Sequence, residues 1–193
     1  MGRVDGGTIT RNEALAHAQD LVSAVDIPVS GDFENGFGQD PETVAETIRL
    51  AAEVGLAGCS IEDTALPEFG AYAFEFSVDR IRAAAAAARA LPGDFVMIAR
   101  ADGLIYGTYD LEEAIRRVQA YEAAGADGVY IPAPPDFEGL KRIVDSVSVP
   151  VNALASGGFS NHRIEDFARI GVARISVGAA LSRVAYGAAI DVA

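Results

Sequence analysis

Two acidic residues, Asp32 and Glu34, stand two positions apart in the segment SGDFENGFG (residues 30–38), where an apolar stretch gives way to glycines. In a β-strand, side chains at positions i and i+2 point to the same side. This spacing predicts that the two carboxylates lie side by side at the carboxyl end of a strand. Because neighbouring negative charges repel, such a pair requires a cation or a bound proton. A solvated turn is the alternative for these residues.

Further polar side chains follow the other apolar segments. Glu62 and Asp63 end one segment, Arg100 and Asp102 end the next, and Asn152 lies in a later one. Each has a structural alternative: the first two can cap a loop, the second two can form an ion pair, and the asparagine can satisfy a backbone group. Their occurrence at matching positions favours a shared site.

The chemistry of this set is that of a magnesium site beside a bound carboxylate. Mg²⁺ prefers oxygen ligands and often keeps several waters, with only one or two direct carboxylates. Asp32 is the predicted direct ligand, and Glu34 and Glu62 are predicted to hold metal-bound water. Arg100 would bind a substrate carboxylate in bidentate fashion, with Asn152 as a further substrate contact.

A parallel sheet is needed to bring these residues together, and the chain alternates apolar segments with helical patterns. Helix starts are marked by Asp40-Pro41 and by Asp110, where Glu113 completes an expected capping box. The expected strands are residues 27–34, 58–63, 95–102, 128–133, 149–155 and 174–179. The expected helices are residues 11–25, 40–55, 77–91, 110–125, 137–147, 162–170 and 180–189.

An internal repeat supports this division. EVGLAGCSIED, AAGADGVYIPA and RIGVARISVGA each run from a helix end through glycine into a strand. Such units fit either an open doubly wound sheet or most of a (β/α)₈ barrel. The open sheet typically carries a glycine-rich nucleotide loop after its first strand, and neither GxGxxG nor GxxxxGKS/T occurs here. The sequence therefore favours the α/β class and an incomplete TIM barrel with about six β/α units.

Composition is that of an ordinary globular protein, with 50% hydrophobic and 22% charged residues among 193, which predicts one domain over residues 1–193. The net charge of −13 argues against a nucleic-acid or anionic membrane partner. The single cysteine, Cys59, excludes an internal disulfide and is expected in the core, whereas His17 and His162 are expected on helix surfaces. Without a signal-like or membrane-length apolar segment, a cytoplasmic location is predicted.

The segments VSGDFENGFG, GCSIEDT and MIARAD, with AGADGVYIPA and VPVNALA, resemble the isocitrate lyase/phosphoenolpyruvate mutase superfamily. Within it they are similar to the phosphoenolpyruvate mutase-like and oxaloacetate decarboxylase-like branch. The resemblance implies a (β/α)₈ barrel that depends on Mg²⁺, with Mn²⁺ as an alternative ion. Members form or break C–C or P–C bonds next to a 2-oxo acid through an enolate-type intermediate. A homo-oligomer acting on a small carboxylate substrate is expected.

By this resemblance, Asp32 is the direct metal ligand, Glu34 is the second acid of the DxE pair, and Glu62 is the acid of the ED motif. Asp5, in GRVDGG, resembles a further family aspartate, and Arg100 matches a substrate-binding arginine. The implied metal set is Asp32, Glu34 and Glu62, and the implied catalytic set is Arg100, Glu62 and Asp5. The metal and Arg100 would stabilise the negative charge of the enolate.

The loop after the ED motif departs from the family. It reads ALPEFGAYAFEF, without the KRCGH of isocitrate and methylisocitrate lyases and without the lysine and asparagine of phosphonopyruvate-forming mutases. A decarboxylase or another C–C lyase for a small 2-oxo or 2-hydroxy dicarboxylic acid is therefore expected. The alternatives are a P–C bond mutase or hydrolase and a catalytically inactive fragment. Residues 64–76 are expected to form a lid.

The ends of the sequence also differ from the family pattern. Relatives carry two further β/α units before the GRVDGG-like segment, including a loop that binds the substrate carboxylate, whereas Met1 here closely precedes Asp5. This difference predicts that Met1 is an internal methionine or that the gene is truncated. Residues 186–193 end where relatives continue into helices that pack on a neighbouring subunit.

Overall fold

The computed structural model describes residues 6–192, and its central feature is a six-stranded sheet. All neighbouring strands are parallel, in the order β1-β2-β5-β6-β7-β8. The strands are β1 (Ser30–Asp32), β2 (Gly58–Glu62), β5 (Val96–Arg100), β6 (Gly128–Tyr130), β7 (Val151–Leu154) and β8 (Arg174–Ser176). The six expected strands are confirmed, each shorter than its apolar segment.

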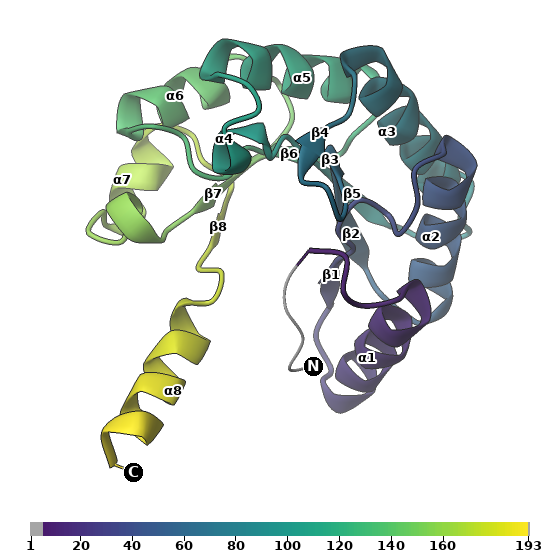
Figure 1. Cartoon of the computed structure of the whole chain (residues 1–193), viewed down its shortest axis with the longest axis horizontal. Coiled ribbons are helices and arrows are strands. Elements are labelled where there is room, and N and C mark those ends of the chain that lie inside the picture. Colours follow the sequence, from purple (N-terminus) through teal and green to yellow (C-terminus); the bar gives the residue numbers. More distant parts are fainter. Residues whose placement is uncertain (1–5, 193) are drawn as a thin grey trace.

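Helices connect these strands. They are α1 (Arg11–Ala24), α2 (Pro41–Glu53), α3 (Phe74–Arg89), α5 (Leu111–Ala123), α6 (Phe137–Asp145), α7 (Ile164–Arg169) and α8 (Ala180–Val192). Figure 1 shows the sheet curled into an open arc, with α2, α3, α5 and α6 on its outer, convex side. A curled parallel sheet with helices outside is the architecture of a (β/α) barrel. The described part of the chain forms six strands of such a barrel, as expected.

Local signals explain where two of the helices begin. Asp40 accepts a hydrogen bond from the backbone N–H of Thr43, and Pro41 takes the first helical position of α2. Asp110 accepts the backbone N–H of Glu113 in the same way at the start of α5. The Glu113 carboxylate binds two arginines of its own helix, so the expected capping box at α5 is wrong.

The main hydrophobic core fills the space between the sheet and the outer helices. Its buried members come from both layers, among them Ile48 of α2, Ile61 of β2, Met97 of β5 and Val118 of α5. Cys59 is fully buried among them, which confirms its expected place. Because the outer helices hold the strands from the convex side, the side chains on the concave side are available for chemistry.

The sequence patterns do not predict several short elements near the strand ends. β3 (Thr64–Ala65) and β4 (Gly70–Ala71) form an antiparallel hairpin within the segment expected to be a lid. Helix α4 (Gly103–Tyr106) follows β5, and the 3-10 turn η1 (Gly157–Phe159) follows β7. Helix α3 begins at Phe74, three residues before the expected start at position 77.

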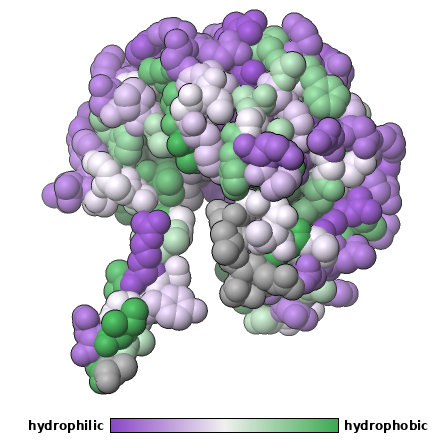
Figure 2. All heavy atoms as spheres, viewed as in Figure 1, coloured by the Kyte–Doolittle hydropathy of each residue, from purple (hydrophilic) through white to green (hydrophobic). Residues whose placement is uncertain are grey.

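Helix α8 extends away from the sheet as a separate arm (Figures 1 and 2). It has no buried residue, and five of its large apolar side chains are 72–88% exposed: Leu181, Val184, Tyr186, Ile190 and Val192. An exposed apolar surface of this kind is typical of a contact surface. Among residues 6–192, no helix combines the length and apolar character needed to cross a bilayer.

Candidate active site

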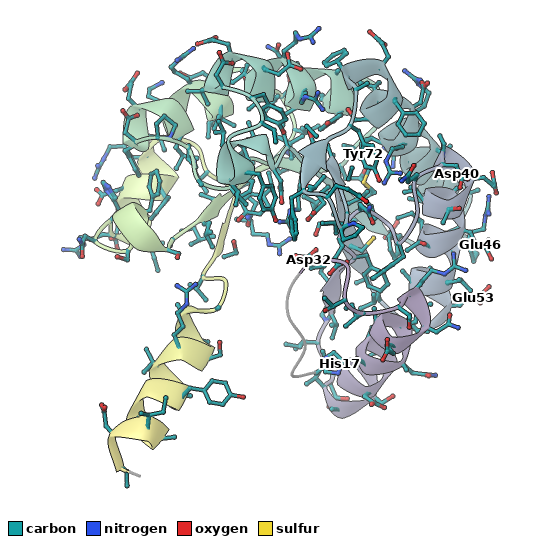
Figure 3. All side chains as sticks on the ribbon, viewed as in Figure 1. His17, Asp32, Asp40, Glu46, Glu53 and Tyr72 are labelled. Atoms are coloured by element: carbon teal, nitrogen blue, oxygen red, sulfur yellow. The ribbon has the colours of Figure 1, made fainter. Side chains whose placement is uncertain are left out.

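The carboxyl ends of β1, β2 and β5 bring three of the predicted residues together. Asp32, Glu62 and Arg100 are the last residues of these strands, and Glu62 lies directly opposite Arg100. Figure 3 shows Asp32 on the concave side of the sheet, whereas Glu46 and Glu53 lie on the outer helix α2. The carboxyl end of the strands is where the active sites of (β/α) barrels are located.

Arg100 is the centre of this cluster. Its Nη1 lies 2.5 Å from Oδ2 of Asp32, and its Nη2 lies 3.5 Å from Oε2 of Glu62. Asp102 binds the guanidinium in bidentate fashion, with Nε 3.2 Å from Oδ1 and Nη2 2.6 Å from Oδ2. The guanidinium also lies over the ring of Tyr130, 5.3 Å from its centroid. Arg100 therefore forms a structural ion pair and belongs to the strand-end cluster at the same time.

Negative charge exceeds positive charge in this cluster. Burial, together with repulsion from Asp102, raises the pKa of Glu62 well above its usual range, and Arg100 opposes the shift. Burial also raises the pKa of Asp102, again against the attraction of Arg100. The side chain of Asp32 is less buried than these two, with 60% of it exposed. Three carboxylates around one guanidinium can accommodate a further cation, and Asp32 is the carboxylate most open to solvent.

Glu34 does not continue the strand that ends at Asp32. It lies in a turn with a backbone φ of +48°, so the i, i+2 alternation of a strand does not apply. Both oxygens of its carboxylate accept the backbone N–H of Gly7, at 3.2 and 3.1 Å. Glu34 lines a separate recess of about 340 Å³ beside α1. The prediction that the two acids project from one strand face is wrong.

The predicted metal set is therefore assembled only in part. Across residues 6–192, no group of three or more acidic, histidine or cysteine side chains is placed to hold a metal ion. Asp32 and Glu62 remain together around Arg100, and this pair fits the preference of Mg²⁺ for one or two direct carboxylates plus water. Asp5 lies outside the described residues.

A cavity of about 500 Å³ lies on the concave side, and Asp32, Arg100 and Asn152 are among its lining residues. Asn152 is only 5% exposed. Its amide nitrogen donates a hydrogen bond to Oγ of Ser176 at 3.0 Å, while its amide oxygen has no hydrogen-bond partner in the described chain. Asn152 thus satisfies no backbone group, so that alternative is wrong.

A buried network behind the cluster is missing from the sequence predictions. Asp63 accepts hydrogen bonds from the hydroxyls of Tyr109 and Tyr121, from Arg117 and from the backbone N–H of Asp102. It therefore joins the end of β2 to α5 instead of capping a loop. No sequence signal marks these partners, because they lie 39 to 58 positions further along the chain.

Neither histidine lines the cavity. His17 is exposed on α1, as expected. His162 is exposed too, but it lies in a turn before α7 instead of on the helix, and its ring stacks on Phe137 with a centroid distance of 4.2 Å. A catalytic role for either histidine has no support from the geometry of the cavity.

A curled parallel sheet with carboxylates and an arginine at its carboxyl end defines a (β/α) barrel protein suited to binding a small anion there. The chain belongs to the phosphoenolpyruvate phosphomutase family, whose model matches residues 1–193. This membership agrees with the superfamily resemblance of the sequence motifs.

Individual relatives support the same assignment. An oxaloacetate decarboxylase of Pseudomonas entomophila (strain L48) is 33% identical over 192 residues, covering 96% of this chain and 63% of that protein. A protein of Burkholderia cenocepacia J2315, provisionally described as a lyase or mutase, has a TM-score of 0.90 and 45% identity, covering 95% of this chain and 66% of that one. A phosphonopyruvate hydrolase in complex with oxalate and Mg²⁺ has a TM-score of 0.85 and 28% identity, covering 96% and 66%. The chain thus spans less than two thirds of the length of the curated relative.

Proposed function

We propose that this chain provides the active site of a Mg²⁺-dependent lyase, which cleaves or forms a C–C bond of a small 2-oxo or 2-hydroxy dicarboxylic acid through an enolate. The observation that carries the proposal is the position of Arg100 between Asp32 and Glu62 at the carboxyl ends of the strands. Similarity to an oxaloacetate decarboxylase supports the C–C lyase class.

Asp32 and Glu62 are the residues that would hold the metal. Burial raises the pKa of Glu62, so this carboxylate gains from an added positive charge, and the exposed Asp32 gives an ion access to the cluster. When bound, Mg²⁺ supplies a Lewis acid that stabilises negative charge on a substrate oxygen. Mn²⁺, which also accepts oxygen ligands, is the alternative ion.

Arg100 would bind and orient the substrate carboxylate. Asp102, whose side chain is 1% exposed, holds the Nε and Nη2 side of the guanidinium and so sets its direction. The remaining donor, Nη1, contacts the exposed Asp32 and could exchange that partner for a substrate carboxylate. A cation fixed in this way beside the reacting centre stabilises the charge of an enolate without reorganisation.

A P–C bond hydrolase or mutase is the second candidate. It is supported by the similarity to a phosphonopyruvate hydrolase. The same residues would serve, since cleavage of a P–C bond next to a 2-oxo acid also leaves an enolate. Product analysis separates the candidates. Oxaloacetate would give pyruvate and carbon dioxide with a C–C lyase, whereas phosphonopyruvate would give pyruvate and phosphate with a hydrolase or its isomer phosphoenolpyruvate with a mutase.

Calorimetric titration of Mg²⁺ into the purified chain, with and without oxalate, tests the site. Oxalate is a stable mimic of the pyruvate enolate. We expect Mg²⁺ to bind and oxalate to tighten that binding by about tenfold, which is about 1.4 kcal/mol. Asp32→Ala should abolish both effects, whereas Glu53→Ala, which removes an exposed acid from the outer side of α2, should leave them unchanged.

A folded chain that binds neither ligand would contradict the proposal and favour a catalytically inactive fragment. If the Asp32→Ala variant still binds Mg²⁺ and oxalate, residues other than Asp32 hold the metal. Circular dichroism of the wild type and both variants establishes that each chain is folded before the titrations are compared.

A homo-oligomer is the proposed assembly, with a small carboxylate as substrate. The exposed apolar side chains of α8 support it, because a lone helix of this kind gains free energy when a second chain covers it. Sedimentation velocity should then give a species larger than the 20.1 kDa monomer. A monomer at all concentrations would contradict this assembly. The cytoplasmic location stays a prediction.

A further inference from the structure

Four polar residues form a row across neighbouring strands on the concave side. Arg100 lies opposite Tyr130, Tyr130 lies opposite Asn152, and Asn152 lies opposite Arg174. All four line the cavity of about 500 Å³. Adjacent strands are about 4.8 Å apart, so Asn152 lies about 10 Å and Arg174 about 14 Å along the sheet from Arg100. The row therefore extends well beyond the proposed reaction centre.

Asn152 has an unused hydrogen-bonding group. Its side chain is 5% exposed, and only its amide nitrogen has a partner, Oγ of Ser176 at 3.0 Å. That hydroxyl also lies 3.4 Å from the carbonyl oxygen of Ala153. The amide oxygen has no partner in the described chain. Buried polar groups of native proteins are nearly always paired, so an unpaired one beside a cavity points to a ligand.

The far wall of the cavity is positively charged. Arg174 and Arg183 both line it, both are exposed, and within residues 6–192 neither forms an ion pair. Arg100 differs, because three carboxylates surround it. One end of the cavity thus holds the carboxylate of Asp32 beside Arg100. Three strands away, its lining holds two arginines that have no acidic partner in the described chain. A molecule bound along the cavity would therefore contact Arg100 and Asp32 with one end and Arg174 with the other.

We propose that Asn152 and Arg174 form a second subsite, which binds the anionic end of the substrate that lies farther from Arg100. This inference rests on the proposed function, in which Arg100 holds the 2-oxo or 2-hydroxy acid end. The guanidinium of Arg174 would bind a carboxylate or a phosphonate in a planar fork, and the amide of Asn152 supplies both a donor and an acceptor beside it. A substrate that fills both sites therefore carries two negatively charged groups. The subsite selects for a second charged group and against a methyl group.

A series of ligands that share one 2-hydroxy acid end tests the subsite. Lactate ends in a methyl group; malate carries a carboxylate on that carbon, and 2-hydroxy-3-phosphonopropanoate carries a phosphonate on it. Dissociation constants are measured by calorimetry in the presence of Mg²⁺, with oxalate as the ligand that reaches only the first site. We expect the wild-type chain to prefer the dianions to lactate by about tenfold or more, and the preferred dianion distinguishes a carboxylate from a phosphonate source.

Variants then assign the preference to residues. Arg174→Gln and Asn152→Leu should each reduce the preference to less than about threefold while oxalate binding stays within about twofold of the wild type. Arg174→Lys should keep part of the preference because it keeps the positive charge. A purely structural role of Arg174 does not predict this result. Arg163→Gln, at an exposed arginine whose side chain is 81% exposed and which does not line the cavity, is the control.

The outcomes separate this inference from the proposed function. If the wild-type chain binds oxalate but does not prefer malate or the phosphonate to lactate, the subsite is overturned, whereas the proposed metal and enolate site around Arg100 keeps its support. The subsite is also overturned if folded Arg174→Gln and Asn152→Leu variants keep the full preference. If the wild-type chain binds no oxalate, the proposed function fails and the subsite fails with it.

Discussion

Replacing Asp63 with alanine should destabilise the chain by about 3–5 kcal/mol, because the buried guanidinium of Arg117 would keep only the partly exposed Glu113 as an acidic partner. The side chain of Asp63 is 1% exposed, and that of its partner Arg117 is 6% exposed, with 3.0 Å between Nη1 and Oδ2. The hydroxyls of Tyr109 and Tyr121 lose their acceptor as well, at 2.7 and 2.9 Å. Domains are typically stable by about 5–15 kcal/mol, so this loss is a large fraction of the total.

Removal of Arg117 together with Asp63 should reduce the loss. Arg117→Met keeps much of the side-chain length, and the double variant leaves no buried cation without a partner. We expect the double variant to be more stable than the sum of the single changes implies, by about 1–3 kcal/mol. This non-additivity is the signature of a direct interaction, as opposed to two independent contributions to packing.

Urea unfolding followed by far-ultraviolet circular dichroism measures these free energies. Asp79→Ala, at an acid on α3 whose side chain is 57% exposed, is the control and should change the free energy of unfolding by no more than about 0.5 kcal/mol. A loss below about 1 kcal/mol for Asp63→Ala, or strict additivity in the double variant, would refute the argument that this pair anchors the end of β2.

Two further predictions concern titratable groups. Burial and the negative charge of Asp32 raise the pKa of the Cys59 thiol. A thiol reagent should therefore label the native chain only as fast as the chain unfolds, and should label it rapidly in urea. Rapid labelling of the native chain would contradict the buried position of Cys59. Hydrogen bonds from Arg116, then from Arg117, lower the pKa of Glu113 below its ordinary value of 4.5. Its stabilising contribution is therefore complete above that value and is lost as the pH falls through the folded pKa, so the wild type should lose stability more steeply on acidification than Glu113→Gln. The free energy of unfolding is measured as a function of pH for the wild type and for Glu113→Gln. Equal slopes for the two chains at acidic pH would disprove the assignment of this contribution to Glu113.

The sequence alone was sufficient to predict the alternation of strands and helices. Apolar segments bounded by glycine, and capping residues such as Asp40 and Asp110, act on residues only a few positions away. Their effects can therefore be predicted from the sequence alone. The same local logic predicted that Asp32, Glu62 and Arg100 lie near the carboxyl ends of their strands, because polar residues follow the apolar part of each segment. The strands end one or two residues earlier than expected. Parallel pairing then brings such ends together.

Only the tertiary structure decided how these side chains are used. A left-handed backbone at Glu34 ends the alternation that the DxE spacing assumed, and its carboxylate accepts the N–H of Gly7. The side chain of Arg80, on a helix rich in charge and alanine, is 1% exposed and donates to the carbonyl of Gly38 beyond β1. Asp63 finds two of its partners, Arg117 and Tyr121, on a helix that begins 48 positions later, at Leu111. Such contacts depend on helix packing against the sheet, which brings distant residues into contact and which no spacing along the chain encodes.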